Sequence, residues 1–149
     1  MQASLAVIIE RSREARDQRV SQAHAAGMAV QQAQAVLQQL QGYRLDYLRR
    51  SPSAPGLRVR VEQLVEFQRF VAKLDEAIGL QGQELALRRQ RELESQRLLA
   101  EAQRRLLAFE ALLARHADER ARLARRREQR DTDEFAAQAA RRMPAHERS

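Results

Sequence analysis

The sequence is poor in the residues that build β-sheets, disulfides and compact enzyme cores. Its 149 residues include no Cys, no Trp, three Pro and five Gly, and only 4% are aromatic. Without Cys, disulfides, Cys-ligated zinc and thiol catalysis are excluded. So few Gly, Pro and aromatic residues exclude a β-sandwich, a barrel and a compact α/β enzyme. No apolar run approaches the ~18 residues of a membrane span, and no secretory signal is found. We therefore expect a soluble, cytoplasmic, elongated α-helical protein.

The residues that dominate instead are Ala, Arg, Gln, Leu and Glu, which all favour helices. Helices must stop near the three prolines, because Pro cannot continue a helix and disfavours helical geometry in the residue before it. Two of these prolines lie in SPSAPG. The sequence predicts a single domain with four parts: a helix over about 3–50, a turn at 51–56, a helix over about 57–142 and a frayed tail at 143–149. The strand-like alternation of Leu57, Val59 and Val61 leaves open a second start near residue 61.

Both helical stretches carry a heptad repeat, the pattern of a coiled coil, with mainly apolar residues at its a and d positions. The rows, in steps of seven, run from Ile9 to Arg44 (a) and Leu5 to Tyr47 (d), and then from Leu57 to Leu113 (a) and Arg60 to His116 (d). A short loop between two such helices favours an antiparallel arrangement. The predicted fold class is all-α: a long antiparallel two-helix coiled-coil hairpin with an overhanging C-terminal helix.

Two registers of this hairpin bring a positions opposite d positions near the turn. The preferred register pairs Tyr47 with Leu57, because it closes the shorter loop. The other pairs Arg19 with Glu92, which adds an ion pair. In either register two polar interruptions of the seam meet, and a polar layer of this kind helps to fix the register. The interruptions are Ser12, Arg16 and Arg19 in the first stretch and Arg88, Glu92 and Ser95 in the second.

The second helix is predicted to be longer than its partner. In both registers Leu5 pairs near residues 99–106, so residues 104–142 are expected to have no partner in this chain. This overhang still carries apolar residues such as Phe109, Leu123 and Phe135. We therefore expect it to require another protein, a second copy or disorder.

No motif for catalysis or cofactor binding is found. The phosphate-binding GxxxxGK, the GxSxG elbow and the HExxH zinc motif are all missing. The three histidines lie far apart in the sequence. We therefore expect no enzyme activity, no catalytic residue, no cofactor and no bound metal.

Two clusters each allow two interpretations. The densest basic run, ARLARRREQR at 121–130, is either a solvated helix face or a surface for an anionic partner: nucleic acid, lipid or an acidic protein groove. The aromatic residues Tyr43, Tyr47, Phe67 and Phe70 gather near the predicted turn. Their spacing favours core packing, with a partner-docking site as the alternative. Charge along the chain is too evenly mixed for a nucleic-acid-binding tail.

Three segments, in order, resemble the flagellar export protein FliJ family over nearly the whole chain. YRLDYL at 43–48 resembles the paired tyrosines near the end of the family's first helix. VEFQRFVAKLDEAI at 65–78 resembles the aromatic-rich start of its second helix. DTDEFAAQAARRMP at 131–144 resembles its C-terminal signature and is the most specific of the three. The resemblance implies a non-catalytic coiled coil of the flagellar type III export apparatus, similar to the γ-subunit stalk of rotary ATPases.

The resemblance also implies partners and a location. The terminal end of the hairpin would enter the hexameric export ATPase FliI, and the turn end would contact the cytoplasmic domain of the export gate FlhA. Export chaperones that lack cargo would be further partners, at the cytoplasmic side of the inner membrane, without direct membrane insertion. The implied gate-facing residues are Leu40, Tyr43, Tyr47, Phe70, Leu74 and Ala77. The implied ATPase-facing residues are Arg122, Leu123, Arg125, Arg126, Arg130 and Phe135.

Two alternative functions remain open at this point. One is a coiled-coil stalk or scaffold of a related type III secretion system such as the injectisome, which the C-terminal signature separates only weakly. The other is a basic coiled coil that binds nucleic acid. A steep salt dependence of DNA affinity would support the second alternative.

Overall fold

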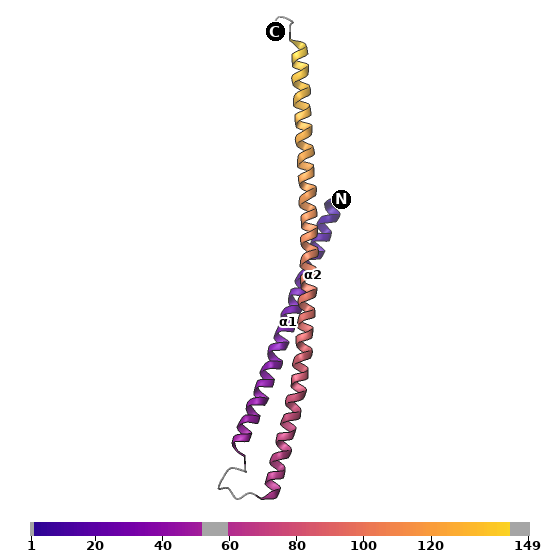
Figure 1. Ribbon diagram of the computed structural model, residues 1–149. Coiled ribbons are helices and arrows are strands. Elements are labelled where there is room, and N and C mark those ends of the chain that lie inside the picture. Colours follow the sequence, from indigo (N-terminus) through magenta and orange to yellow (C-terminus); the bar gives the residue numbers. More distant parts are fainter. Residues whose placement is uncertain (1, 52–59, 144–149) are drawn as a thin grey trace. The chain divides into compact units, whose positions relative to one another are not determined.

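The computed structural model describes residues 2–51 and 60–143. It contains two helices, α1 (Gln2–Arg49) and α2 (Val61–Arg142), which run in opposite directions (Figure 1). The helix α2 begins at the later of the two starts that the sequence allowed. The predicted turn from Pro52 onward, Leu57 and Val59, and the predicted tail from Pro144 onward lie outside the described residues.

Backbone hydrogen bonds and charges explain where the helices begin and end. The N–H groups of Arg50 and Ser51 donate to carbonyls three residues earlier, which tightens the last turn of α1 ahead of Pro52. The carbonyl of Arg60 accepts hydrogen bonds from the N–H groups of Gln63 and Leu64 in the first turn of α2. Glu62 lies in the first turn of α2, and two arginines lie in its last turn. Both placements suit the helix dipole, which favours negative charge at the N-terminus and positive charge at the C-terminus.

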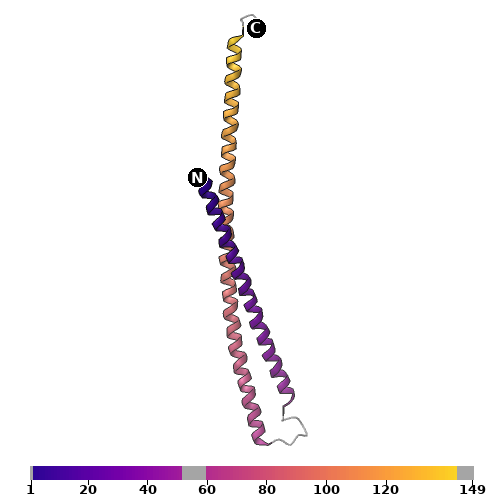
Figure 2. The same cartoon turned by 180° about the vertical axis from the view of Figure 1, so that it is seen from behind.

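The chain forms two compact units, which we describe separately. The hairpin unit comprises Glu14–Gln103, and the terminal unit comprises Met1–Arg13 with Arg104–Ser149. In the hairpin unit, the two views from opposite sides agree that α1 and α2 lie side by side (Figures 1 and 2).

The heptad rows form the seam between the helices, as predicted. Every a and d position from Leu5 to Tyr47, and from Leu64 to His116, is buried or half-buried. Arg60 is exposed, and Leu57 is not described. The fully buried members are Leu5, Ile9 and Leu106 in the terminal unit and Ala33 and Leu85 in the hairpin unit. The predicted fold class, an all-α helical hairpin, is confirmed.

Both predicted registers are wrong in the hairpin unit. The Tyr47 ring packs against Phe67 and Phe70, which follow the partner expected in the preferred register by 10 and 13 residues. Glu92 lies beside Gly27 rather than Arg19: a Cβ added at Gly27 would lie 3.4 Å from Oε2 of Glu92. The contacts fit a register about one heptad further along α2 than the register that pairs Arg19 with Glu92, and about two heptads further than the preferred one. Heptad rows repeat every seven residues, so they do not distinguish registers that differ by seven. The criterion of the shorter loop favours the wrong register, because α2 begins only at Val61.

The predicted polar layer is wrong for the same reason. Arg88 Nη1 donates to the carbonyl of Ala29, and Gln81 Nε2 donates to the carbonyl of Ala33, both at 3.0 Å. We call these two bonds from α2 to the α1 backbone the carbonyl clasp. It forms where α1 presents small residues, so that side chains of α2 reach the main chain of α1. Arg88 therefore faces an alanine-rich part of α1 and not the predicted arginines.

Candidate partner-binding surfaces

The aromatic cluster of the hairpin unit divides into a buried and an exposed part. Tyr47 is half-buried and stacks on Phe67, with ring centroids 4.9 Å apart and planes inclined by 9°. It also packs against Phe70, with a distance of 4.4 Å between the ring centroids. Tyr43 is 54% exposed and Phe70 is 44% exposed. Core packing, the interpretation that the spacing favoured, therefore describes Tyr47 and Phe67, while Tyr43 and Phe70 expose aromatic surface.

Neighbouring polar contacts hold this cluster in place. Gln39 Nε2 and the Tyr43 hydroxyl are hydrogen-bonded at 2.8 Å along α1. The Arg44 guanidinium donates to the Asp75 carboxylate from one helix to the other. Because both side chains are partly exposed, this ion pair contributes at most about 1 kcal/mol to stability.

A groove of about 660 Å³ adjoins two of the residues that the resemblance implies for the gate. Leu40 of α1 and Ala77 of α2 line it together. Leu74 is half-buried in the seam. The sequence analysis missed two other lining residues, Leu80 and Leu87, which are 61% and 42% exposed. A signal for them existed: they are leucines seven residues apart that lie outside the a and d rows.

In the terminal unit, the seam extends further along α2 than predicted. Leu5, Ile9 and Leu106 form a buried cluster, and Phe109 and Leu113 pack against it. Arg13 Nη2 lies 3.5 Å from Oε1 of Glu110, from α1 to α2. The prediction that residues 104–142 lack a partner in this chain is therefore wrong at its start. The cause is again the register, which brings α1 opposite a later part of α2.

Beyond His116, α2 makes no seam in the described chain. Every residue from 117 to 143 is exposed, and we call this stretch the exposed segment. Arg122 Nη2 lies 3.2 Å from Asp118 Oδ2, an ion pair within the helix itself. Leu123 is 53% exposed and Phe135 is 74% exposed. All six residues implied for the ATPase lie in this segment: Arg122, Leu123, Arg125, Arg126, Arg130 and Phe135.

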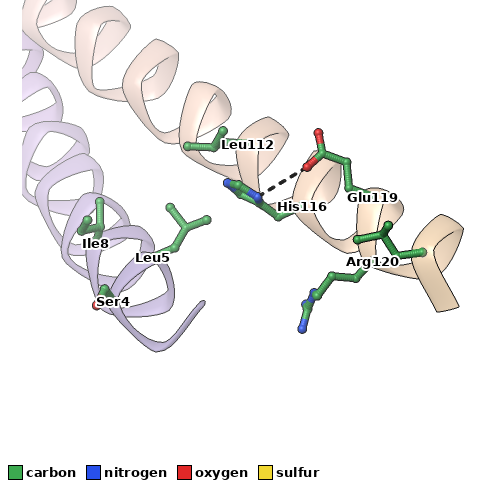
Figure 3. A pocket seen from close by; sticks show the side chains of 8 residues that line it. Ser4, Leu5, Ile8, Leu112, His116, Glu119 and Arg120 are labelled. Carbon is green, nitrogen blue, oxygen red and sulfur yellow. Dashed lines mark ion pairs between the residues drawn. The ribbon is translucent and has the colours of Figure 1, made fainter. Parts of the chain in front are cut away.

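An apolar groove of about 430 Å³ lies where the exposed segment begins. Figure 3 shows Leu5 and Ile8 on α1 facing Leu112 and His116 on α2. His116 Nδ1 lies 4.0 Å from Oε2 of Glu119. The sequence analysis did not select Ile8. The run Val7–Ile8–Ile9 contained the signal, because three successive apolar residues of a helix cannot all face one seam.

The described side chains show one clear electrostatic perturbation. Arg97 Nη2 donates to Oε1 of Glu94 at 2.7 Å, and this bond holds the pKa of the Glu94 carboxyl below its usual value. The same contact raises the pKa of Arg97. Among residues 2–51 and 60–143, no three His, Asp or Glu side chains gather closely enough to hold a metal. In that same part of the chain, no helix is long and apolar enough to cross a membrane.

These features define a class of protein: a two-helix antiparallel coiled coil whose candidate sites are exposed helix faces. The family model described as Flagellar FliJ protein matches residues 1–145, and the chain belongs to this family. Its role is therefore in flagellar protein export, as a component of a non-catalytic family. Comparisons with curated proteins and with solved structures gave no match.

Proposed function

We propose that this chain couples the export ATPase FliI to the export gate FlhA and handles export chaperones that lack cargo. It would act in the cytoplasm, at the inner membrane beneath the flagellum. The exposed segment is the observation that carries this proposal. Helices in proteins are stabilised mainly by packing of one face, yet every residue from 117 to 143 is exposed. A partner that covers this segment accounts for its length and its apolar side chains.

The charge of the exposed segment suits an acidic ATPase surface. Residues 120–130 include six arginines and one acidic residue. Leu123 and Phe135 add exposed apolar area. Complementary charge speeds association and selects the partner, while buried apolar anchors supply most of the affinity. Arg122, Arg125, Arg126 and Arg130 would steer the segment to FliI, and the two apolar residues would anchor it.

The aromatic cluster of the hairpin unit suits the gate. Tyr43 and Phe70 are large and exposed; Phe70 packs against Tyr47, and Tyr43 is hydrogen-bonded to Gln39. Rigid aromatic side chains of this kind are typical anchors of protein interfaces. Leu40, Leu74 and Ala77 would border them and exclude water from the contact.

The gate contact is tested by the double variant Tyr43→Ala, Phe70→Ala. Its affinity for the cytoplasmic domain of FlhA, measured by calorimetry, should fall at least tenfold, because each anchor contributes more than about 1 kcal/mol. Leu45→Ala is the matched control, since Leu45 is 52% exposed in the same unit but lies outside the cluster. Full affinity in a double variant of unchanged helical content would remove both residues from the site.

The ATPase contact is tested by the double variant Arg122→Glu, Arg126→Glu. Stimulation of FliI ATPase activity should fall at least tenfold, because repulsion replaces attraction. Arg104→Glu with Arg105→Glu is the control, because both residues are exposed on α2 before the exposed segment. Equal loss in the control would show that overall charge, and not this segment, governs the contact.

A further inference from the structure

A long stretch of α1 in the hairpin unit carries no charged residue. Residues 20–43 of α1 contain no Asp, Glu, Lys or Arg, although 32% of the chain is charged. Burial does not explain this, because within the stretch only Ala33 is fully buried, while Val36 and Tyr43 are 43% and 54% exposed. Depletion of charged residues distinguishes the core of a protein interface from other surface. The composition therefore indicates a surface that a partner covers.

Two grooves lie along this uncharged stretch and share one lining residue, Glu84. The first, of about 660 Å³, lies between Leu40 of α1 and the pair Leu80 and Leu87 of α2. The second, of about 580 Å³, lies between Gln32 of α1 and Arg91 of α2. All residues that line either groove occupy c, d, f or g positions of the heptad. Both grooves therefore follow the same flank of the hairpin.

The dimensions and spacing of this flank fit a helix. From Ala77 to Ser95 the grooves follow about 27 Å of α2, the length of a helix of about 18 residues. Leu80 and Leu87 lie one heptad apart, the interval at which an amphipathic helix presents its own apolar residues. We propose that this flank binds an amphipathic α-helix of a partner protein, which completes a three-helix coiled coil.

The charges lining the flank specify the polar part of that helix. Glu84 is paired with Arg88 at 2.9 Å, and Glu94 is paired with Arg97 at 2.7 Å. Arg91 lines the groove and has no ion pair in the described part of the chain. The partner helix should therefore place leucine-sized residues over Leu80 and Leu87 and an Asp or Glu near Arg91. The uncharged bank of α1 disfavours nucleic acid, whose binding depends on neutralised phosphates.

This inference goes beyond the proposed coupling function and is tested by different residues. Leu40 and Ala77 belong to both surfaces, so they do not discriminate between them. Tyr43→Ala with Phe70→Ala tests the gate contact, and changes at Leu80, Leu87 and Arg91 test the helix-binding flank. These variants therefore distinguish loss of the gate contact from loss of helix binding at the flank.

The probe is a fluorescein-labelled peptide of about 20 residues, with Leu at heptad positions, Ala and Gln elsewhere and one Glu at the end that meets Arg91. Its anisotropy on titration with the full chain should show saturable binding, while a peptide of the same composition with shuffled leucines should bind at least tenfold more weakly. Leu80→Ser with Leu87→Ser should weaken binding at least tenfold. Leu93→Ser is the matched control, because Leu93 is 66% exposed on the same helix but lines neither groove.

A charge exchange tests the predicted orientation. Arg91→Glu should weaken binding of the peptide, and replacing the peptide's Glu by Arg should restore it. No saturable binding, or equal binding by the double serine variant of unchanged helical content, would overturn the proposal. A dimer of the chain by light scattering that Leu80→Ser and Leu87→Ser convert to a monomer would also overturn it, because a second copy would then be the occupant.

Discussion

Replacing Ala33 by Leu should destabilise the hairpin, although Leu is a favoured residue at d positions of coiled coils. Ala33 is 1% exposed, the least exposed of the buried residues in the described chain. Its carbonyl accepts the hydrogen bond from Gln81 Nε2 at 3.0 Å. A leucine side chain in this position must move α2 away from α1. That movement would also break the nearest bond of the carbonyl clasp.

The magnitude follows from these two effects. Forcing extra methylene groups into a packed site costs about 1–3 kcal/mol. Loss of the Gln81 hydrogen bond adds about 1 kcal/mol. The free energy of unfolding should therefore fall by about 2–4 kcal/mol, and the melting temperature by on the order of 10 °C for a chain of this size.

Urea and thermal unfolding followed by circular dichroism measure this effect. Ala35→Leu is the matched control, because Ala35 is exposed two residues away on α1. Its effect should stay within about 0.5 kcal/mol of the parent chain. If Ala33→Leu unfolds at higher urea concentration than the parent, α2 does not approach α1 closely at this point and the reasoning is refuted.

Three further predictions concern register, packing and charge. A disulfide should form between cysteines replacing Ala33 and Leu85 and not between cysteines replacing Ala33 and Ile78, as measured by gel mobility after oxidation. Ile9→Ala should lower the free energy of unfolding by about 2–4 kcal/mol in urea titrations, because it leaves a cavity in the buried cluster. By NMR, the Glu94 carboxyl should titrate below its usual pKa, and Arg97→Ala should raise that pKa. Because the folded pKa is lowered, the stabilisation is present above the usual pKa of Glu and is lost as pH falls through the folded value.

The sequence was sufficient to predict the seam because burial follows the heptad. The a and d rows that begin at Ile9 and Leu5 lie at the interface over their whole described length. The end of the seam was also foreseeable: Arg120 and Arg127 occupy a positions that continue the row of Leu113, and both are exposed. A charged residue at successive seam positions is too costly to bury without a partner.

The register was not predictable in the same way. A shift of seven residues preserves every pairing of a with d, so apolar matching alone cannot rank such registers. The carbonyl clasp, made by Gln81 and Arg88 with the backbone at Ala33 and Ala29, contributes to that choice. Every residue has a main-chain carbonyl, so the residue types of α1 do not indicate which carbonyls accept these hydrogen bonds.

The candidate surfaces were only partly predictable. Tyr43 and Phe70 stood out as large aromatic residues just outside the seam rows. Leu80 and Leu87 were overlooked because they lie in a row of their own, which becomes a groove only when the uncharged side of α1 lies beside it. Such a surface arises from two helices together, and so from the register that the sequence left undetermined.

Deletion of residues 118–149 tests most directly the central claim that coupling to the ATPase resides in the exposed segment. The seam ends at His116 in the described chain, so the free energy of unfolding should change by no more than about 0.5 kcal/mol. Affinity for the cytoplasmic domain of FlhA should also be unchanged. Binding and stimulation of FliI, measured by phosphate release, should be lost. A truncated chain that still stimulates FliI fully would contradict the account and assign coupling to the paired part of the hairpin.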